Sequence, residues 1–151
     1  MKVAFLVTAI VVILILVAVI GTRIVPRPLA AYTGAPGVTT TTPIPEDLPA
    51  PVARFYRTVY GDELPVFTSA VITARAPMRI NGITLQARIR FTHDAGRGYR
   101  HYIEATWFGI PILRINERYL DGEGVMELPF GTASGPRIDQ GANLGLWAET
   151  V

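Results

Sequence analysis

The chain opens with an unbroken apolar run. Residues 3–20 carry no charge and consist of fourteen Val, Ile, Leu or Phe residues, three Ala and Thr8. As an α-helix this run is about 27 Å long, close to the ~30 Å hydrocarbon core of a bilayer. Its side chains favour insertion by on the order of 4–8 kcal/mol in total. We therefore expect a transmembrane anchor over residues 1–25 that contacts the lipid bilayer through residues 3–20.

A cleaved signal peptide is the alternative to an anchor. Its apolar region is about 7–15 residues long and is followed closely by a small-residue cleavage site. Here Arg23 and Pro26 come before the first Ala pair, Ala30-Ala31, so the pattern favours an uncleaved anchor. Basic residues near the two ends give no clear orientation. We favour a domain outside the cytoplasm, because long tails cross largely regardless of charge, and a cytoplasmic domain stays open.

A change of composition follows the apolar run. Residues 26–51 contain seven of the twelve prolines and the run Thr39–Thr42. Such a segment builds no core and prefers an extended geometry. We expect residues 26–50 to form a Pro/Thr-rich linker to a domain over residues 51–151.

The spacing of apolar residues in that domain predicts a mainly β, α+β fold. Apolar residues recur at helical spacing between Pro51 and Gly61, which predicts a short helix over 51–60 that covers the sheet or, alternatively, binds a partner. Strands are expected over 66–74, 83–92, 99–107 and 112–120, with unbroken alternation in 83–92. Short connections make neighbouring strands antiparallel, so we expect an antiparallel sheet of five or more strands.

The stretch NERYLDGEGVMEL, residues 116–128, holds four carboxylates. Asp121-Gly122 between two strand-like runs predicts a two-residue hairpin. In that register Arg118 lies diagonally between Glu123 and Glu127, so these acids are expected to be cross-strand partners of Arg. They follow no calcium-loop spacing and no His accompanies them as in a zinc site. We therefore expect no metal site.

Glu117 is the one charged residue on the opposite, apolar face of this hairpin. A carboxylate there must be ion-paired, protonated or at the rim of a cavity. Glu117 is therefore a candidate catalytic residue; an ion pair with an Arg or a bulge that turns it outward are the structural explanations. His101 alternates with apolar residues and is the second candidate. Candidate ligand-binding residues are Tyr99, Trp107, Tyr119 and Met126.

Composition and motifs reduce the number of function classes that fit the chain. Although the pI is about 9.2, residues 52–151 carry eleven Arg and ten acids, and no aromatic-basic motif is present, so we expect no nucleic-acid partner. The sequence contains neither a Gly-rich phosphate loop nor a nucleophile elbow, the motifs that would indicate a cofactor or a familiar hydrolase. Residues 75–100 are Arg-rich and later strands acidic; these strands either pair with each other or face anionic lipid headgroups.

The last residues predict a C-terminal helix. Asp139 is a suitable N-cap, and Leu144, Trp147, Ala148 and Val151 follow at helical spacing. Because this apolar stripe runs to the last residue, we expect the chain to be the front part of a longer protein. A short helix that simply docks is the alternative.

Four stretches together resemble a known family: LPAPVARFYRTVYGDELPV, FTHDAGRGYRHYIEATWFGIP, NERYLDGEGVMELPFG and DQGANLGLWAETV. They look like an uncharacterised bacterial family of single-pass membrane proteins, catalogued as a domain of unknown function. The resemblance covers about residues 48–151. In that family the last stretch runs on into further strands, which implies that this chain corresponds to the N-terminal part only. The resemblance implies no particular activity.

These observations favour a membrane-anchored, non-enzymatic binding or scaffold domain for an apolar or lipid ligand or for a protein partner. A curved sheet with one apolar face and a covering helix can hold a hydrophobic ligand; the half-barrel of lipoprotein carriers is the analogy. One alternative is a carboxylate-dependent hydrolase centred on Glu117, with His101. The other is a truncated fragment without independent activity, which would expose Leu144 and Trp147.

Overall fold

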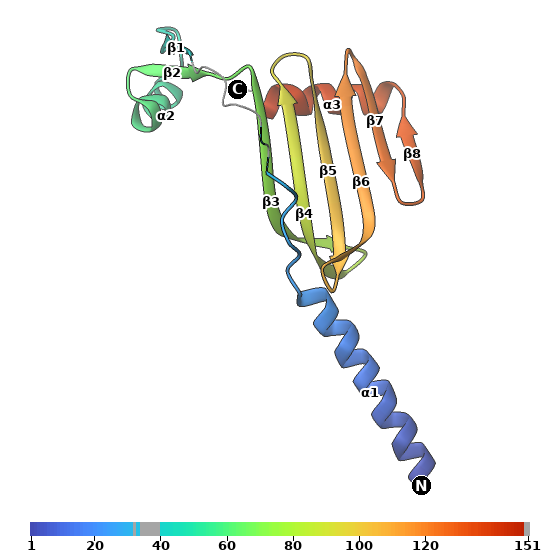
Figure 1. Ribbon diagram of the computed structural model, residues 1–151. Helices are drawn as coiled ribbons and strands as arrows, with labels where there is room; N and C mark the ends of the chain where they lie inside the picture. The colour runs from blue at the N-terminus through green and yellow to red at the C-terminus, as the bar shows by residue number, and fades with distance from the viewer. Residues whose placement is uncertain (32, 34–39, 150–151) are drawn as a thin grey trace.

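The computed structural model describes residues 1–31, 33 and 40–149 (Figure 1). Its elements are α1 (Lys2–Arg23), β1 (Thr40–Pro43), α2 (Ala50–Tyr60), β2 (Glu63–Val66), β3 (Ser69–Ile80), β4 (Ile83–Asp94), β5 (Gly98–Trp107), β6 (Ile110–Leu120), β7 (Glu123–Leu128), β8 (Gly131–Ser134) and α3 (Pro136–Glu149). The expected α+β class is confirmed: an N-terminal apolar helix, a short helix, an antiparallel sheet and a C-terminal helix.

The main sheet is a meander of six strands, β3 to β8, in which each strand pairs antiparallel with the next. The predicted hairpin register is confirmed, since Glu117 lies opposite Met126 and Asn116 opposite Glu127. Asp121 and Gly122 have φ angles of 51° and 92°, as a two-residue turn between twisted strands requires. β1 and β2 form a separate two-stranded sheet.

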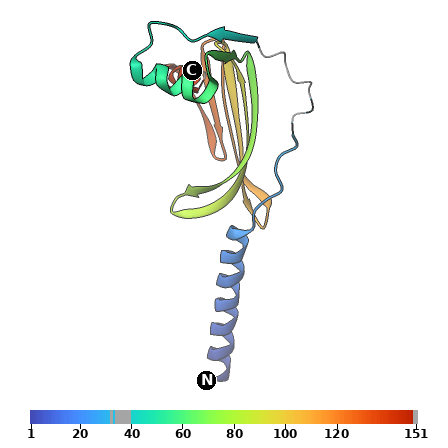
Figure 2. The same cartoon turned by 90° about the vertical axis from the view of Figure 1, so that its left-hand side faces the viewer.

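The main sheet is curved, and different parts of the chain lie on its two faces (Figure 2). α2 and α3 lie on the side toward which the sheet bends, the concave face, and residues 24–31 run along the opposite, convex face. In the middle of β4, Ile89 alternates with Arg88 and Arg90, and all three are half-buried. Alternation along the strands thus gives an apolar concave face and a polar convex face.

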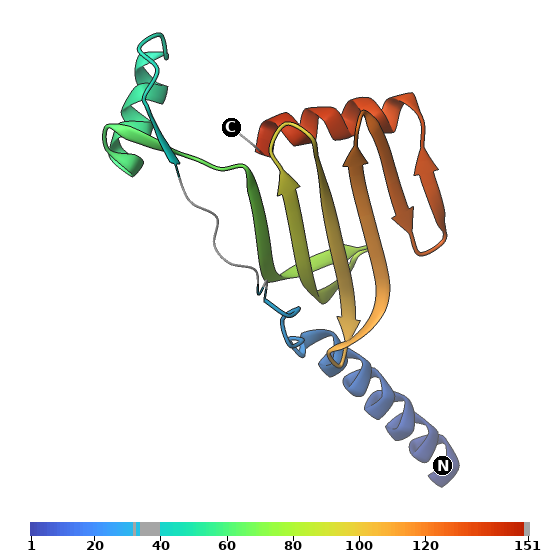
Figure 3. The same cartoon turned by 45° about the horizontal axis from the view of Figure 1, so that its top comes forward.

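α3 packs across one end of the strands (Figure 3). Its Ala142 and Leu146 are 3% and 2% exposed and form a core cluster with Tyr99 and Tyr119. Gly124 on β7 permits the close approach, because a Cβ there would lie 3.1 Å from the Ile138 side chain. This small cluster is what attaches α3 to the sheet.

Three predictions about these elements are wrong. The strand expected over 66–74 is interrupted: β2 ends at Val66, and β3 begins at Ser69 after Thr68 turns its carbonyl to accept a hydrogen bond from Ala95 N, at 2.9 Å. α2 has no buried residue and does not cover the sheet; α3 takes that role. Asp139 does not cap α3, which begins at Pro136; its carboxylate instead accepts a hydrogen bond from Gly124 N at 2.7 Å.

The predicted apolar stripe of α3 does not contact the sheet. Leu144 and Trp147 are 67% and 59% exposed, because the helix faces the strands through Ile138, Ala142 and Leu146, spaced four residues apart. Val151 lies outside the described residues.

Described parts of the predicted linker contact the domain. Arg88 Nη1 donates a hydrogen bond to the Arg27 carbonyl at 3.4 Å, and Arg90 Nη2 donates to the Ala30 carbonyl. Further on, residues 40–43 form β1, and Thr41 Oγ1 donates to Glu63 Oε2 at 2.6 Å. Residues 24–31 therefore form a strap of extended chain on the convex face.

The docking face of α3 is testable with two leucines that lie two positions apart. Leu146→Ala should lower the free energy of unfolding by about 2–5 kcal/mol, because it leaves a cavity against Tyr99 and Tyr119. Leu144→Ala, at an exposed position, should change it by less than ~0.5 kcal/mol. Denaturant unfolding of the full chain in detergent, followed by circular dichroism, measures both. Equal effects of the two substitutions would contradict this packing.

Candidate functional site

Four polar side chains lie side by side on the concave face near α3: His93 of β4, Tyr99 and His101 of β5, and Glu117 of β6. The strand register places His101 opposite Glu117 and His93 opposite Tyr99. Tyr99 OH donates a hydrogen bond to Glu117 Oε1 at 2.7 Å, and His101 Nδ1 lies 3.7 Å from Glu117 Oε2. His101 Nε2 lies 3.3 Å from His93 Nε2. We call these four residues the His–Glu row.

Aromatic rings hold the His–Glu row in place. The ring of His101 lies 4.0 Å from that of Phe91 and 4.4 Å from that of Tyr99, between centroids. The side chain of His101 is 11% exposed, whereas that of Glu117 is 26% exposed. Glu117 thus lies on the apolar face where the hairpin register places it, and its partners are a tyrosine and a histidine.

The row ends in a groove of about 570 Å³ between the α2–β2 segment and the far ends of β3 and β4. Its walls are mostly aromatic and aliphatic: Tyr56, Tyr60, Pro65, Val66, Phe67, Ile72 and Phe91, with His93 as a polar group. Small-molecule pockets typically measure about 300–1,000 Å³ and combine apolar walls with a few polar groups. The groove therefore suits a ligand with an apolar body.

Among the candidates from the sequence, the structure brings Glu117, His101, Tyr99 and Tyr119 together. Met126 lies opposite Glu117 on β7 and is half-buried. Trp107 lies at the other end of β5, where its indole contacts α1, so it does not join the row.

Sequence reasoning did not identify His93 as a residue of the site, nor Tyr56 and Tyr60 of α2 as walls of the groove. The alternation recognised over 83–92 continues to His93, which places this side chain on the same face as Ile89 and Phe91. Extending the strand by one residue would have found it. No local signal indicated that Tyr56 and Tyr60 line a groove with residues of β3 and β4, because this depends on the tertiary arrangement of α2 and the sheet.

Within the described residues, no group of three or more His, Asp or Glu side chains is arranged to hold a metal ion. In the His–Glu row the reason is geometric. His101 faces His93 with Nε2 and Glu117 with Nδ1, so the three side chains do not converge on one point as a metal site requires.

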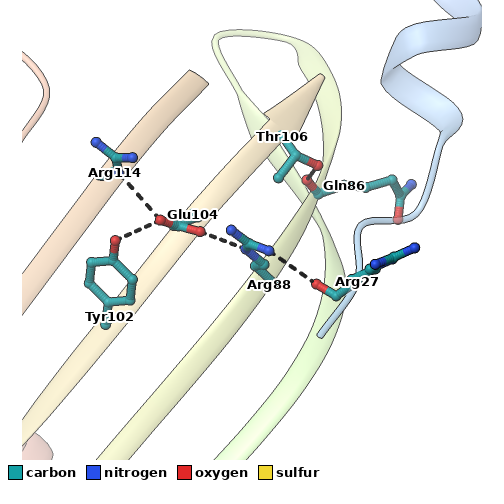
Figure 4. A network of polar contacts seen from close by, with 7 residues as sticks. All are labelled: Arg27, Gln86, Arg88, Tyr102, Glu104, Thr106 and Arg114. Carbon is teal, nitrogen blue, oxygen red and sulfur yellow. Dashed lines mark hydrogen bonds and ion pairs between the residues drawn. The ribbon is translucent and has the colours of Figure 1, made fainter. Parts of the chain in front are cut away.

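A second polar constellation lies on the convex face around Glu104 (Figure 4). Arg88 Nε donates a hydrogen bond to Glu104 Oε2 at 2.6 Å, Tyr102 OH donates to Oε1 at 2.7 Å, and Arg114 Nε lies 3.3 Å from Oε1. Glu104 is 5% exposed. Basic and acidic strands of the sheet thus pair with one another, one of the two arrangements that the charge pattern allowed.

The environment of Glu104 changes the pKa of two groups. Burial alone would raise the pKa of Glu104, but the hydrogen bonds from Tyr102, Arg88 and Arg114 outweigh it and lower that pKa. Burial, together with the hydrogen bond to this carboxylate and its charge, raises the pKa of Tyr102. The charged carboxylate therefore stabilises the centre of the sheet.

A similar bridge continues toward β7. Asn116 accepts a hydrogen bond from Arg100 Nε at 2.6 Å and donates one to Glu127 Oε2 at 2.6 Å. Arg118 Nη2 lies 3.9 Å from Glu127 Oε1, which confirms the expected pairing of Arg118 with that acid. These contacts give Glu127 a structural role.

Glu104→Gln tests the convex network through its pH dependence. A carboxylate whose pKa is lower in the folded chain contributes stability above its ordinary value, 4.5, and loses it as pH falls through the folded value. We expect the variant to be less stable by about 2 kcal/mol at pH 7. The difference should shrink steadily below pH 4.5.

Glu123→Gln, at an exposed position of the β6–β7 hairpin, is the matched control and should change stability by less than ~0.5 kcal/mol. Denaturant unfolding across the acid range provides the measurement. A Glu104→Gln deficit that does not change with pH would contradict the role of the charge.

Comparison with known proteins places the chain in a family. Residues 38–151 match DUF6544, which is described as a family of unknown function. No curated protein and no solved structure matches the chain. The family match covers more than half of the chain and agrees with the expected domain of unknown function. The chain therefore belongs to the family of unknown function DUF6544.

Proposed function

We propose that this chain is a membrane-anchored protein that binds an apolar or amphipathic, lipid-like ligand in the groove between α2–β2 and β3–β4. The groove is the observation that carries the proposal. It combines a volume of about 570 Å³ with mostly aromatic and aliphatic walls and one histidine. That combination fits an acyl chain whose polar end lies toward His93.

The anchor is α1. Among the described residues it is the one helix long and apolar enough to cross a membrane, with a mean hydropathy of 3.5 over its most apolar window and none of that window buried. Side chains such as Phe5 and Leu14 are 78% and 62% exposed. Removing apolar surface from water is worth roughly 25 cal/mol per Å², so a bilayer around α1 is strongly favoured over water.

The shape of the sheet supports an apolar ligand as well. α3 covers only one end of the concave face, and Ile89, Ile103 and Ile115 in its middle are half-buried. Apolar surface therefore continues from the groove along the strands. A protein partner is the other class of occupant and is an outcome of the test below.

Photolabelling with a diazirine-bearing fatty acid tests the groove in the full chain reconstituted in vesicles. We expect labelled peptides from 56–72 and 91–95, together with α1 as an internal reference. Ile72→Gln should reduce the groove label about tenfold, since burying an isoleucine is worth roughly 1.5–3 kcal/mol. Labels on α1 should not change.

Val71→Gln is the matched control, because Val71 is 36% exposed and lies one position away on the other face of β3. It should leave the groove label at the wild-type level. Label confined to α1, or equal losses in the two variants, would contradict lipid binding in the groove and favour a protein partner.

A carboxylate-dependent hydrolase is the second candidate, favoured by one observation. The His–Glu row connects Glu117 through His101 to His93, which lines the groove. In such a site a histidine oriented by a carboxylate accepts a proton from an attacking water. The Tyr99 hydroxyl holds the other oxygen of Glu117.

Assay of the full chain with p-nitrophenyl acyl esters separates the two candidates. The binding proposal predicts no turnover above the vesicle background. A hydrolase would show turnover that Glu117→Gln reduces by about 10²-fold or more and that Glu123→Gln leaves unchanged. Turnover with that pattern would replace binding by catalysis as the function of the groove.

A further inference from the structure

The turn between β5 and β6 is attached to the last turns of α1. Trp107 Nε1 donates a hydrogen bond to the Ala18 carbonyl at 3.0 Å, and Phe108 N donates one to the Gly21 carbonyl at 2.9 Å. Gly21 is the one buried residue of α1. Figures 1 and 2 both show this end of the sheet meeting the helix. The contact therefore fixes the height of the turn along α1.

The contact requires that residue 21 has no side chain, as in glycine. A Cβ at that position would lie 2.6 Å from the ring of Phe108 and even closer to the Trp107 indole nitrogen. The two rings lie edge to face, 4.8 Å apart, and cover the notch that the missing side chain leaves. A bulkier residue in α1 at this point would force the turn away.

The conformation of Phe108 indicates that the aromatic ring is needed there. Phe108 has a φ of 53° and is followed by Gly109 at 76°. Two equivalent turns in the sheet use the residues that tolerate this conformation, Asn81-Gly82 and Asp121-Gly122. A phenylalanine with positive φ is rare, so its position reflects the contact with α1 and not the needs of the turn.

The attachment points lie within the apolar helix. Ala18 comes five residues before Arg23, the charged residue at the end of α1, which is about 7.5 Å along the axis; Gly21 lies about 3 Å before it. If α1 crosses a bilayer as proposed, these carbonyls lie at or below the headgroups. Tryptophan is enriched at that depth because its ring is apolar and its N–H polar.

Exposed apolar side chains gather at the same end of the sheet. Ile110 and Ile112 of β6 are 66% and 50% exposed, and Trp107 is 39% exposed. Ile83, at the β3–β4 turn, is 59% exposed, and Figure 2 shows that turn near the level of the end of α1. These residues face water in the isolated chain and face lipid if the sheet stands on the bilayer.

We propose that the β5–β6 turn, residues 107–110, is embedded in the interfacial layer of the same phospholipid bilayer that α1 crosses. The inference rests on the proposed anchoring by α1. The turn and the helix end together form one membrane-contacting unit. The sheet then stands directly on the membrane, with the strand ends that form the groove directed away from it.

The two tryptophans of the chain allow a direct test. Trp147→Phe leaves Trp107 as the single tryptophan, and Trp107→Phe leaves Trp147, which is 59% exposed on α3 at the far end of the sheet. Each full-length variant is reconstituted in phosphatidylcholine vesicles whose acyl chains carry bromines at one of two depths. Shallow bromines lie near the headgroup end of the chain, and deep bromines lie near its methyl end.

We expect shallow bromines to quench most of the fluorescence of Trp107 and deep bromines to quench less of it. Neither kind of bromine should quench the fluorescence of Trp147. Alkaline carbonate extraction of the same vesicles reports on α1 separately. Protein that is extracted would overturn the anchoring and the inference with it. Protein that stays in the membrane while Trp107 is quenched no more than Trp147 would overturn the embedded turn alone.

Discussion

The concave face of the sheet has more apolar surface than the chain's own helices cover. α3 buries Tyr99 and Tyr119 at one end through Ala142 and Leu146, and α2 stands beside β3 and β4 without a buried residue of its own. Residues such as Ile103 and Ile115 are left half-buried. Since removal of apolar area from water is the main driving force of association, this incomplete cover supports the proposal that a ligand binds in the groove. On the convex face, Glu104 pairs with Arg88 and Arg114, and the carbonyls of Arg27 and Ala30 accept hydrogen bonds from Arg88 and Arg90.

The two ends of the sheet are chemically different, which gives the molecule a direction. At one end the β5–β6 turn contacts Gly21 of α1 and exposes Trp107 and Ile110. At the other end lie the groove and the His–Glu row. β3 and β4 connect the two ends with twelve residues each, and their concave side chains are mainly apolar. In the proposed arrangement, a lipid-like ligand that leaves a bilayer beside α1 would meet apolar surface along this path before it reaches His93.

Much of this arrangement follows from short-range patterns in the sequence. Alternation predicted which face each residue of β4 takes, and Asp121-Gly122 predicted the β6–β7 register residue by residue, including the position of Glu117 on the apolar face. The approach of His101 to Glu117 could not be predicted in the same way. It depends on the β5–β6 register, which is shifted between Ala105 and Thr106 and closed by a turn that contains a phenylalanine with positive φ. The groove could not be predicted either, because it is lined by residues of α2, β2, β3 and β4 that no local pattern brings together. The start of α3 was misplaced because Gly135, whose carbonyl accepts hydrogen bonds from Ile138 and Asp139, was overlooked in favour of Asp139.

The central claim is that the groove holds an apolar ligand. Native mass spectrometry of the full chain, purified in mild detergent from the membranes in which it is made, tests it most directly. The account predicts the 16.5 kDa chain with a bound amphiphile that fragments to a fatty-acyl or other long hydrocarbon chain, and no such adduct on the Ile72→Gln variant. A bare chain in both preparations, or an adduct that Ile72→Gln retains in full, would contradict the claim.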